Sequence, residues 1–377
     1  MRGEKLQSIQ GLRFVAASAV VYHHACILAL VVCGSFGILG AGNLPGIGAA
    51  GVDIFFVISG LVITLTGPLA DPRPSGAQFF WRRLTRVAPM FWLMTIPALM
   101  TLSITGPMSA YGAGGPMNVA QNIATLLFWP ATESQIVAPY VSQGWTLCFE
   151  MVFYTAVSFV LLGGRMKRNA AILAVVIVIA VLARWVTGWA WLRILANRMF
   201  IEFGYGVVLA FGLGWLRQRG PRLAIPLLLI GLGFYAYAGV KGDLGVDGWL
   251  QTMSDSVSMV RVFIFGTPAV FVVAGALILE PYFRGRLARI CVALGNASYS
   301  IYLVHALILL GMLQLWSMTK IHAPAFLVLL SGLAVGIGAG VVAHLWVERP
   351  LQWAVRWLST QLMSLWTAKL VAPKTPA

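Results

Sequence analysis

The sequence predicts an all-α membrane protein with about ten transmembrane helices. Of its 377 residues, 59% are hydrophobic and only 10% are charged, whereas soluble domains carry roughly 25% charged residues. The apolar residues also gather in long runs, and a helix needs about 20 residues to cross the hydrocarbon layer. A soluble protein of this length would lack the polar surface it needs, so the composition excludes that class.

Ten segments are long and apolar enough to be membrane-spanning helices. They cover residues 11–33, 47–67, 87–106, 144–163, 170–188, 197–216, 222–240, 261–279, 293–316 and 324–347. The first is a retained helix and not a signal peptide, because it is too long for a signal core and contains Arg13, His23 and His24. We expect an outer loop over 107–143, with a short interfacial helix near 122–129.

The basic residues set the predicted orientation. The chain has 26 Lys and Arg against 11 Asp and Glu. With the N-terminus in the cytoplasm, most of the basic residues fall in cytoplasmic segments, as the positive-inside rule expects. Both termini are then cytoplasmic, residues 1–363 form the transmembrane domain, and 364–377 are a cytoplasmic tail without regular structure. Topology explains the charge, so no nucleic-acid partner is predicted.

A short stretch before the third span combines aromatic and basic side chains. Residues 75–86 form an amphipathic segment on the cytoplasmic face, where the aromatic rings anchor at the interface and the arginines reach toward water. Its members are Phe79, Phe80, Trp81, Arg82, Arg83 and Arg86.

Ionisable side chains inside the spans are the candidates for function, because each one is costly in hydrocarbon. Arg13 lies at the cytoplasmic end of the first span, most of the others lie in the outer half, and His305 lies near the middle. The four cysteines show no metal-ligand spacing, so no metal site is predicted. The remaining candidates are His23, His24, Asp53, Glu150, Arg198, Glu202, Arg261 and His344.

Arg13 and His24 are the most informative pair. Eleven residues are three helical turns and a little more, so the two side chains share one face about 16 Å apart. That spacing suits a long donor with an anionic head, such as coenzyme A: arginines would hold its phosphates and His24 would act as general base. Glu150 or Asp53 would orient the imidazole. An intramembrane salt-bridge network or a proton relay explains the spacing equally well.

Several neighbouring residues have competing explanations. His23 is adjacent to His24 and points about 100° away, so only one of them shares the face of Arg13. Asp53 has a second explanation as a helix N-cap. His344 lies close in sequence to Glu348 and is expected to have a structural role.

The order of several motifs resembles the acyltransferase family 3 membrane proteins, and within them the exopolysaccharide O-acetyltransferase group. IQGLR at 9–13, followed by His24 after ten intervening residues, is similar to the family's Arg-x10-His signature. Further similar segments are GVDIFFVISG at 51–60, FWRRLTRVAP at 80–89, GWTLCFE at 144–150, Glu202-Phe203, Arg261 with GTPA at 266–269, and SYSIYLVH at 298–305.

This resemblance implies transfer of an acyl group, usually acetyl from acetyl-coenzyme A, to a carbohydrate hydroxyl. His24 is then catalytic, with Glu150 and Asp53 as its acidic partners. We place the donor site at Arg13, Arg82, Arg83 and Arg86. The acceptor side would comprise Trp145, Arg198, Glu202, Arg261 and His305, although ion pairing for stability alone explains its charged members as well.

The predicted partners follow from this assignment. They are an acyl-coenzyme A donor, a glycan or lipid-linked saccharide acceptor and the lipid bilayer, with no permanently bound cofactor. The expected location is the inner membrane of a bacterium. The alternative function is a transporter or flippase for a saccharide or a proton-coupled solute, in which the same ionisable groups would line a pathway.

Overall fold

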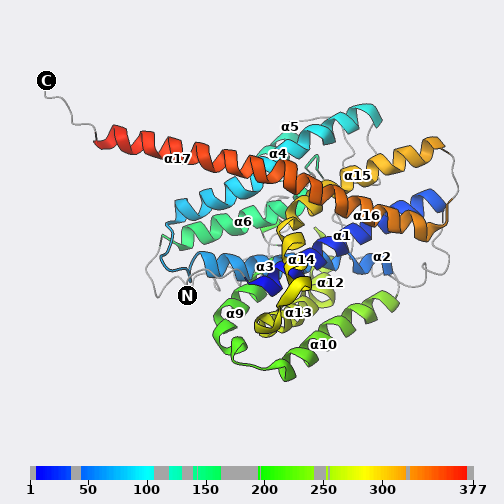
Figure 1. Ribbon diagram of the computed structural model, residues 1–377, viewed down its shortest axis with the longest axis horizontal. Helices are drawn as coiled ribbons and strands as arrows, with labels where there is room; N and C mark the ends of the chain where they lie inside the picture. Colours follow the sequence, from blue (N-terminus) through cyan, green and yellow to red (C-terminus); the bar gives the residue numbers. More distant parts are fainter. Residues whose placement is uncertain are drawn as a thin grey trace.

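The computed structural model describes residues 6–34, 44–105, 119–129, 139–141, 143–162, 194–195, 197–241, 252–253, 255–319 and 323–371. Within these ranges every regular element is a helix or a helical turn, which confirms the predicted all-α class. The predicted span 170–188 lies outside the described residues. Figure 1 shows the helices gathered into one bundle, with the last of them projecting from it.

Six helices in these ranges are long and apolar enough to cross a membrane. Two shorter apolar helices, α3 (Ala50–Thr66) and α6 (Gly144–Val160), accompany them. The predicted count of ten spans and the predicted orientation of the termini therefore stay predictions. The six are α1 (Gln7–Cys33), α9 (Phe200–Arg217), α10 (Pro221–Val240), the helix Ser256–Ile278, α15 (Ser298–Thr319) and the helix Ala325–Gln361.

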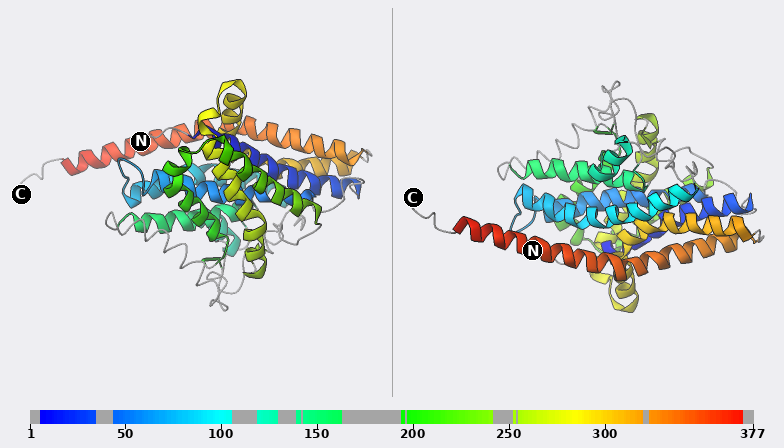
Figure 2. Two further views of the ribbon diagram at one scale, coloured as in Figure 1. Left: turned by 90° about the horizontal axis from the view of Figure 1, so that it is seen from below. Right: turned by 90° about the horizontal axis from the view of Figure 1, so that it is seen from above.

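Helix α1 lies inside the bundle, where it packs against α3, α14 (Gly285–Asn296), α15 and α16 (Ala325–Ala343). Both views in Figure 2 show α15 and α16 running alongside it. A second group pairs α3 with α9 and α10 with α13 (Thr267–Ile278). The helix that carries Arg13 and His24 is thus surrounded by other helices on several sides.

The N-terminus of α1 is capped by a carboxylate from a distant part of the chain. Glu280, in the short 3₁₀ turn η4 (Glu280–Tyr282), accepts hydrogen bonds from the backbone N–H of Gln7 at 2.7 Å and of Ser8 at 2.8 Å. It also accepts one from the Ser8 hydroxyl. The first N–H groups of a helix have no partner within it, and a negative charge there is stabilising. This cap fixes the helix end nearest Arg13.

The amphipathic segment and the third predicted span form one helix, α4 (Gly76–Thr105). Ser75 and Gln78 start it with a reciprocal capping box: each side chain accepts a hydrogen bond from the other's backbone N–H, both at 3.2 Å. A helix is present near the predicted interfacial one, as α5 (Val119–Leu127), a few residues earlier than expected; its place at the interface stays a prediction. The arginines of α4 are therefore held on a continuous helix that enters the bundle.

Two π-helical turns interrupt the long helices next to prolines. The turn η3 (Val262–Gly266) joins α12 (Asp255–Arg261) to α13, and Pro268 follows it. The turn η5 (His344–Glu348) joins α16 to α17 (Arg349–Val371), and Pro350 follows it. Proline has no N–H to donate, and single π turns accommodate such breaks without ending the helix.

The last helix is longer than predicted. Helix α17 continues the line of α16 and runs through Val371. The division into a transmembrane domain over 1–363 and a tail over 364–377 stays a prediction. Residues 372–377 lie outside the described part. The segment contains no glycine or proline before Pro373, so nothing in its local sequence ends the helix earlier.

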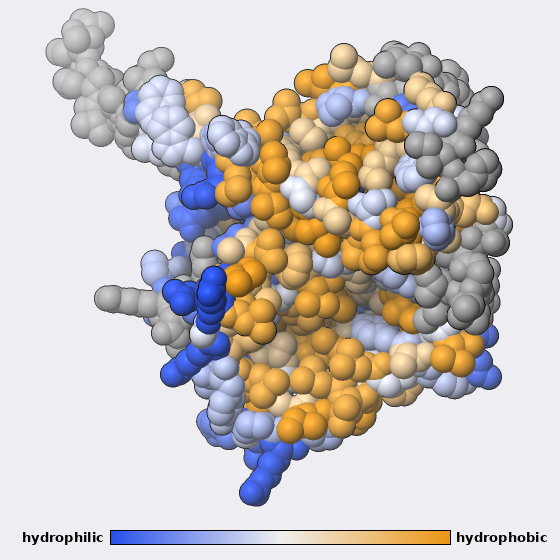
Figure 3. Space-filling view, turned by 45° about the vertical axis from the view of Figure 1, so that its right-hand side comes forward, coloured by the Kyte–Doolittle hydropathy of each residue, from blue (hydrophilic) through white to orange (hydrophobic). Residues whose placement is uncertain are grey.

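One face of the molecule shows the surface expected of a protein in lipid. In Figure 3 hydrophobic residues cover a broad area, and hydrophilic residues gather along the edge from which α17 extends. Large apolar side chains such as Ile96, Leu229 and Trp346 are exposed. In water an apolar surface of this extent would favour aggregation, whereas hydrocarbon solvates it.

A glycine contact between α3 and α9 gives a test of this packing. A Cβ on Gly206 would lie 2.1 Å from the carbonyl oxygen of Val57, whereas a Cβ on Gly212 of the same helix would meet nothing within 4 Å. Gly206→Ala should lower the free energy of unfolding by about 1–3 kcal/mol. Gly212→Ala should leave it unchanged or slightly higher. Thermal unfolding in detergent measures both, and equal midpoints for the two variants would contradict the close approach.

Candidate active site

A cavity opens between five helices. Its empty space of about 750 Å³ includes the part open to the outside. Helices α1, α3, α4, α6 and α15 supply the walls, which combine apolar, aromatic, basic and acidic side chains. The residues that line it are Arg13, Val52, Phe55, Phe56, Ile58, Ser59, Val62, Arg83, Arg86, Val87, Thr146, Leu147, Glu150, Tyr154, Ser298, Tyr299 and Tyr302.

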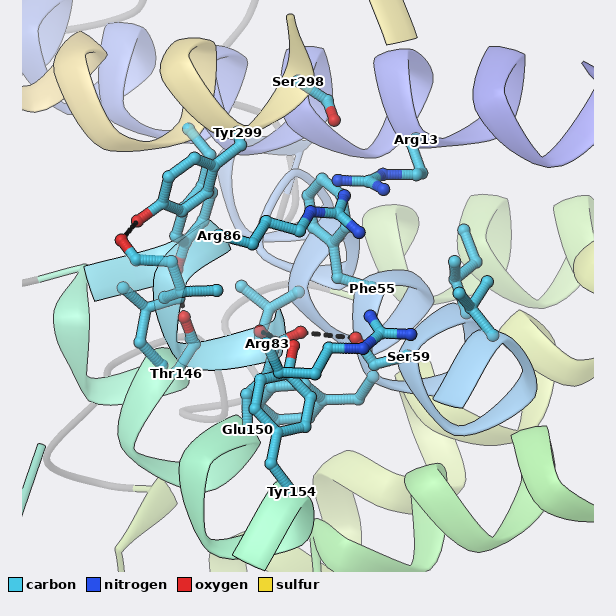
Figure 4. A pocket seen from close by; sticks show the side chains of 17 residues that line it. Arg13, Phe55, Ser59, Arg83, Arg86, Thr146, Glu150, Tyr154, Ser298 and Tyr299 are labelled. Atoms are coloured by element: carbon cyan, nitrogen blue, oxygen red, sulfur yellow. Dashed lines mark hydrogen bonds between the residues drawn. The ribbon is translucent and has the colours of Figure 1, made fainter. Parts of the chain in front are cut away.

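Three arginines and one carboxylate give the cavity a surplus of positive charge. In Figure 4 the guanidinium groups of Arg13, Arg83 and Arg86 point into the same space, opposite Glu150. The Nε of Arg13 is buried and has no hydrogen-bond partner among the described residues. Guanidinium groups form paired hydrogen bonds to carboxylates and phosphates. The cavity is therefore suited to an anionic ligand.

Glu150 is held by two hydroxyl groups. Its carboxylate accepts a hydrogen bond from Ser59 of α3 and another from the Tyr154 hydroxyl, one turn further along α6, at 3.0 Å. Arg83 lies over the ring of Tyr154, 5.6 Å from its centroid, and donates a hydrogen bond to Thr66. Glu150 and Arg83 are thus oriented by their neighbours before any ligand binds.

The N-terminal turns of α15 form the wall facing these groups. The Tyr299 hydroxyl donates to the carbonyl of Val87 at 2.7 Å, and the hydroxyls of Tyr302 and Thr146 are 2.9 Å apart. Ser298 also lines the cavity, and its fully buried hydroxyl has no hydrogen-bond partner in the described ranges. This wall therefore offers a hydroxyl that is free to bind a ligand.

His24 lies further along α1 than the cavity and contacts His305 of α15. The Nδ1 of His24 is 3.0 Å from the carbonyl oxygen of Val20 and 3.4 Å from Nε2 of His305. The ring of His305 is 6.1 Å from that of Tyr302, which lines the cavity. The histidine pair therefore lies directly behind the cavity wall. His23 is buried beside His24, with its ring at a right angle.

Asp53 pairs with Arg261 and does not contact His24. Arg261 donates to the two carboxylate oxygens of Asp53 at 3.0 and 2.8 Å, and to the Ala49 carbonyl at 3.0 Å; both side chains are almost fully buried. The expectation that Asp53 orients the imidazole therefore fails, because its oxygens already face a guanidinium. The alternative as an N-cap is also wrong, since Asp53 makes no capping hydrogen bond.

Glu202 belongs to the same buried group. It is fully buried, and its carboxylate interacts with the charges of Asp53 and Arg261. A Cβ on Gly266 would lie 2.6 Å from its Oε1, so the glycine before Thr267 leaves the room that this carboxylate occupies. None of these three ionisable residues lines the cavity. Ion pairing, the second explanation of the outer charges, is the one that the geometry favours for Arg261. Neither carboxylate oxygen of Glu202 has a hydrogen-bond partner among the described residues.

Other predicted residues are also placed away from the cavity. Arg82 is exposed on α4 and does not line it. Trp145 is buried against the rings of Phe56 and Phe149. Arg198 precedes α9 and is partly exposed. None of the three is among the lining residues.

The structural role expected for His344 is confirmed. Its Nδ1 is 2.7 Å from the Glu348 carboxylate, which also accepts hydrogen bonds from Ser300 at 2.6 Å and Gln352 at 2.8 Å. This cluster ties the π turn η5 to α15. Both oxygens of the buried Glu348 carboxylate therefore have hydrogen-bond partners.

Several residues of the cavity were not singled out from the sequence. Tyr154 carries a readable signal, because it follows Glu150 by one helical turn and therefore shares its face. Ser298, Tyr299 and Tyr302 begin an otherwise apolar helix, which is a weaker signal. Ser59 has only its place in the family-like segment GVDIFFVISG at 51–60, since serine is also common at close helix contacts.

Comparison with known proteins identifies the family. The acyltransferase domain family matches residues 6–345, nearly the whole chain. The chain belongs to acyltransferase family 3. It is 32% identical over 312 residues to the exopolysaccharide production protein ExoZ of Rhizobium meliloti (strain 1021), covering 81% of this chain and 90% of that one. A comparison with the solved structures gave no match.

Two further relatives carry related names. The acyltransferase MdmB of Streptomyces mycarofaciens is 24% identical over 386 residues, with 92% of this chain and 91% of the relative covered. Nodulation protein 10 of Rhizobium leguminosarum bv. viciae is 28% identical over 156 residues, 37% of this chain and 39% of the relative. The family member described here is thus a multi-pass membrane enzyme that transfers acyl groups other than aminoacyl groups. This favours an enzyme over the transporter that the buried charges alone allowed.

Substitutions in the Asp53–Arg261 pair should lower the stability of the protein without weakening ligand binding, because neither residue lines the cavity. Asp53→Ala leaves the buried guanidinium without its main partner and should cost about 3–5 kcal/mol in the free energy of unfolding. Asp53→Ala combined with Arg261→Met should recover part of this loss. Unfolding in detergent measures the stability of the single and the double variant. As a control, Glu150→Gln changes a residue of the cavity and should keep the wild-type stability. A double variant less stable than Asp53→Ala would argue against the pair as a unit.

Proposed function

We propose that the protein is an O-acyltransferase that moves an acetyl group from acetyl-coenzyme A to a hydroxyl of an exopolysaccharide or another cell-surface glycan. The observation that carries the proposal is the cavity with three arginines at one end of α1, with His24 about 16 Å further along the same helix. A long donor with phosphates at one end and a thioester at the other matches this spacing.

The donor would bind with its phosphates against Arg13, Arg83 and Arg86. Charge surplus, the unpartnered Nε of Arg13 and the free hydroxyl of Ser298 all favour an anion here. The proposal leaves Arg82 out, because its side chain is exposed and outside the cavity. Glu150, held by Ser59 and Tyr154, places one negative charge among these arginines.

The chemistry needs one base. The hydroxyl of the acceptor gives its proton to His24 as its oxygen attacks the thioester carbonyl. The carbon–oxygen bond forms, the carbon–sulfur bond breaks, and the leaving thiolate takes the proton from His24. Free coenzyme A and an O-acylated glycan result. No second nucleophile on the chain is required by this sequence of steps.

The orientation of the protein in the membrane and the chemical class of the acceptor rest on separate arguments. The positive-inside rule puts the arginine end of the cavity at the cytoplasm, where acetyl-coenzyme A is made, and the membrane would be the inner membrane of a bacterium. The acceptor class comes from the name of the relative ExoZ, which is an exopolysaccharide production protein. A lipid-linked saccharide would present the same hydroxyl chemistry at the membrane surface.

Transfer of label tests the function directly. Purified protein in vesicles, given acetyl-coenzyme A labelled in the acetyl group and glycan from the producing cell, should label the glycan. His24→Ala should lower the rate by at least about 100-fold, since general bases contribute that much or more, while its Kd for coenzyme A stays unchanged. Equal labelling by the two proteins would exclude His24 as the base. Uptake of free saccharide without labelling would instead favour a transporter.

The arginines give a matched test of the donor site. Arg86→Ala should weaken coenzyme A binding about 10- to 100-fold, because a hydrogen bond to a charged group contributes about 1.5–3 kcal/mol. Arg82→Ala removes the same charge from the same helix outside the cavity and should change the Kd less than about twofold. Calorimetry on the detergent-purified protein measures both. Equal losses would mean that charge alone, and not the cavity, attracts the donor.

A further inference from the structure

We infer that His305 is a positioning residue for His24: it holds the Nδ1 side of the catalytic ring and so leaves Nε2 as the basic nitrogen. The inference rests on the proposed function, in which His24 is the base. It replaces the predicted acceptor-binding role of His305. That role needs an accessible side chain, whereas His305 is 0% exposed and lies behind the cavity wall.

The hydrogen bonds of the two rings determine their tautomers. A backbone carbonyl only accepts, so Nδ1 of His24, 3.0 Å from Val20 O, carries a proton. For the same reason Nδ1 of His305, 3.1 Å from Ile301 O, carries one. In neutral His305 the other nitrogen, Nε2, is then an acceptor. It lies 3.4 Å from Nδ1 of His24, whose N–H is therefore shared between Val20 O and His305.

The consequence for His24 is a lone pair on Nε2. That atom makes no hydrogen bond among the described residues, and the His24 side chain is partly exposed. When Nε2 takes the proton of the acceptor hydroxyl, Nδ1–H still faces the same two acceptors. His305 thus does for this ring what a carboxylate does in many hydroxyl-activating sites, at a position where neither Asp53 nor Glu150 reaches.

Two further residues lie close to the histidine pair. The rings of His24 and His305 are 5.0 Å apart at 66°, and those of His23 and His24 are also 5.0 Å apart, at 87°. A Cβ on Gly336 of α16 would lie 3.7 Å from the Cβ of His305. Apart from His23 and His305, no titratable side chain in the described ranges contacts the His24 ring.

Kinetics on two substitutions separate positioning from packing. His305→Phe keeps a ring but no acceptor and should lower kcat about 10- to 100-fold, because a loosened base is misplaced, with KM for donor and acceptor unchanged. His305→Gln places an amide oxygen near the former Nε2 and should restore most of the rate. If Gln and Phe lower kcat equally at normal stability, the hydrogen bond has no role.

A double variant tests whether His305 acts through His24. His305→Phe should cost nothing further in a His24→Ala background, since residues that act as a unit are not additive. A full additional loss there would show that His305 acts independently of His24, and would overturn the inference.

A spectroscopic test stands even if the transfer activity is absent. Nitrogen NMR on protein with labelled histidine, in lipid at about pH 8 where an ordinary imidazole is neutral, reports which ring nitrogens carry protons. His24→Gln and His305→Gln assign the two signals. Both rings should show protonated Nδ1 and bare Nε2. A proton on Nε2 of His305 would make it a donor and overturn the inference, whereas missing glycan labelling with the expected spectrum would overturn only the proposed function.

Discussion

Helix α1 touches its neighbours backbone to backbone, and glycines make these contacts possible. A Cβ on Gly51 of α3 would lie 2.2 Å from the carbonyl of Ala16, and one on Gly295 of α14 would lie 1.9 Å from that of Gln10. In hydrocarbon, where apolar side chains gain little from burial against one another, such close packing is a main source of helix association. Because Arg13 and His24 both project from α1, the cavity and the histidine pair depend on these contacts.

The buried charges divide according to the partners they find. Asp53 and Arg261 satisfy one another, as do His344 and Glu348. Among the described residues, three arginines and one carboxylate line the cavity, so the arginines keep capacity for a ligand. An ionisable group is costly in a membrane whether or not it is functional. The cavity differs from the Asp53–Arg261 pair in that Arg13 keeps a nitrogen without a hydrogen-bond partner among the described residues.

The proposed separation along α1 between donor binding at the arginines and catalysis at His24 follows from the length of the donor. In this proposal the cavity recognises the anionic end through paired hydrogen bonds from its guanidinium groups. The bond that breaks lies a pantetheine arm away, where charge surplus would serve no purpose and a neutral base is required. Two imidazoles in mutual contact meet that requirement without placing a further carboxylate in the middle of the membrane.

The sequence alone determined the helical class, the bounds of most described spans to within a few residues, and the pairing of Arg13 with His24 on one face, because hydropathy and helical periodicity are local properties. It also indicated Glu150 and the α4 arginines. Residues on different helices met only in the tertiary structure. Asp53 pairs with Arg261, which is more than two hundred residues away in the sequence. Arg83 and Arg86 line the cavity, whereas Arg82 does not. His305 contacts His24. Which side chains meet depends on the rotation of each helix about its axis and on the angles at which the helices cross. No local sequence pattern encodes these two quantities.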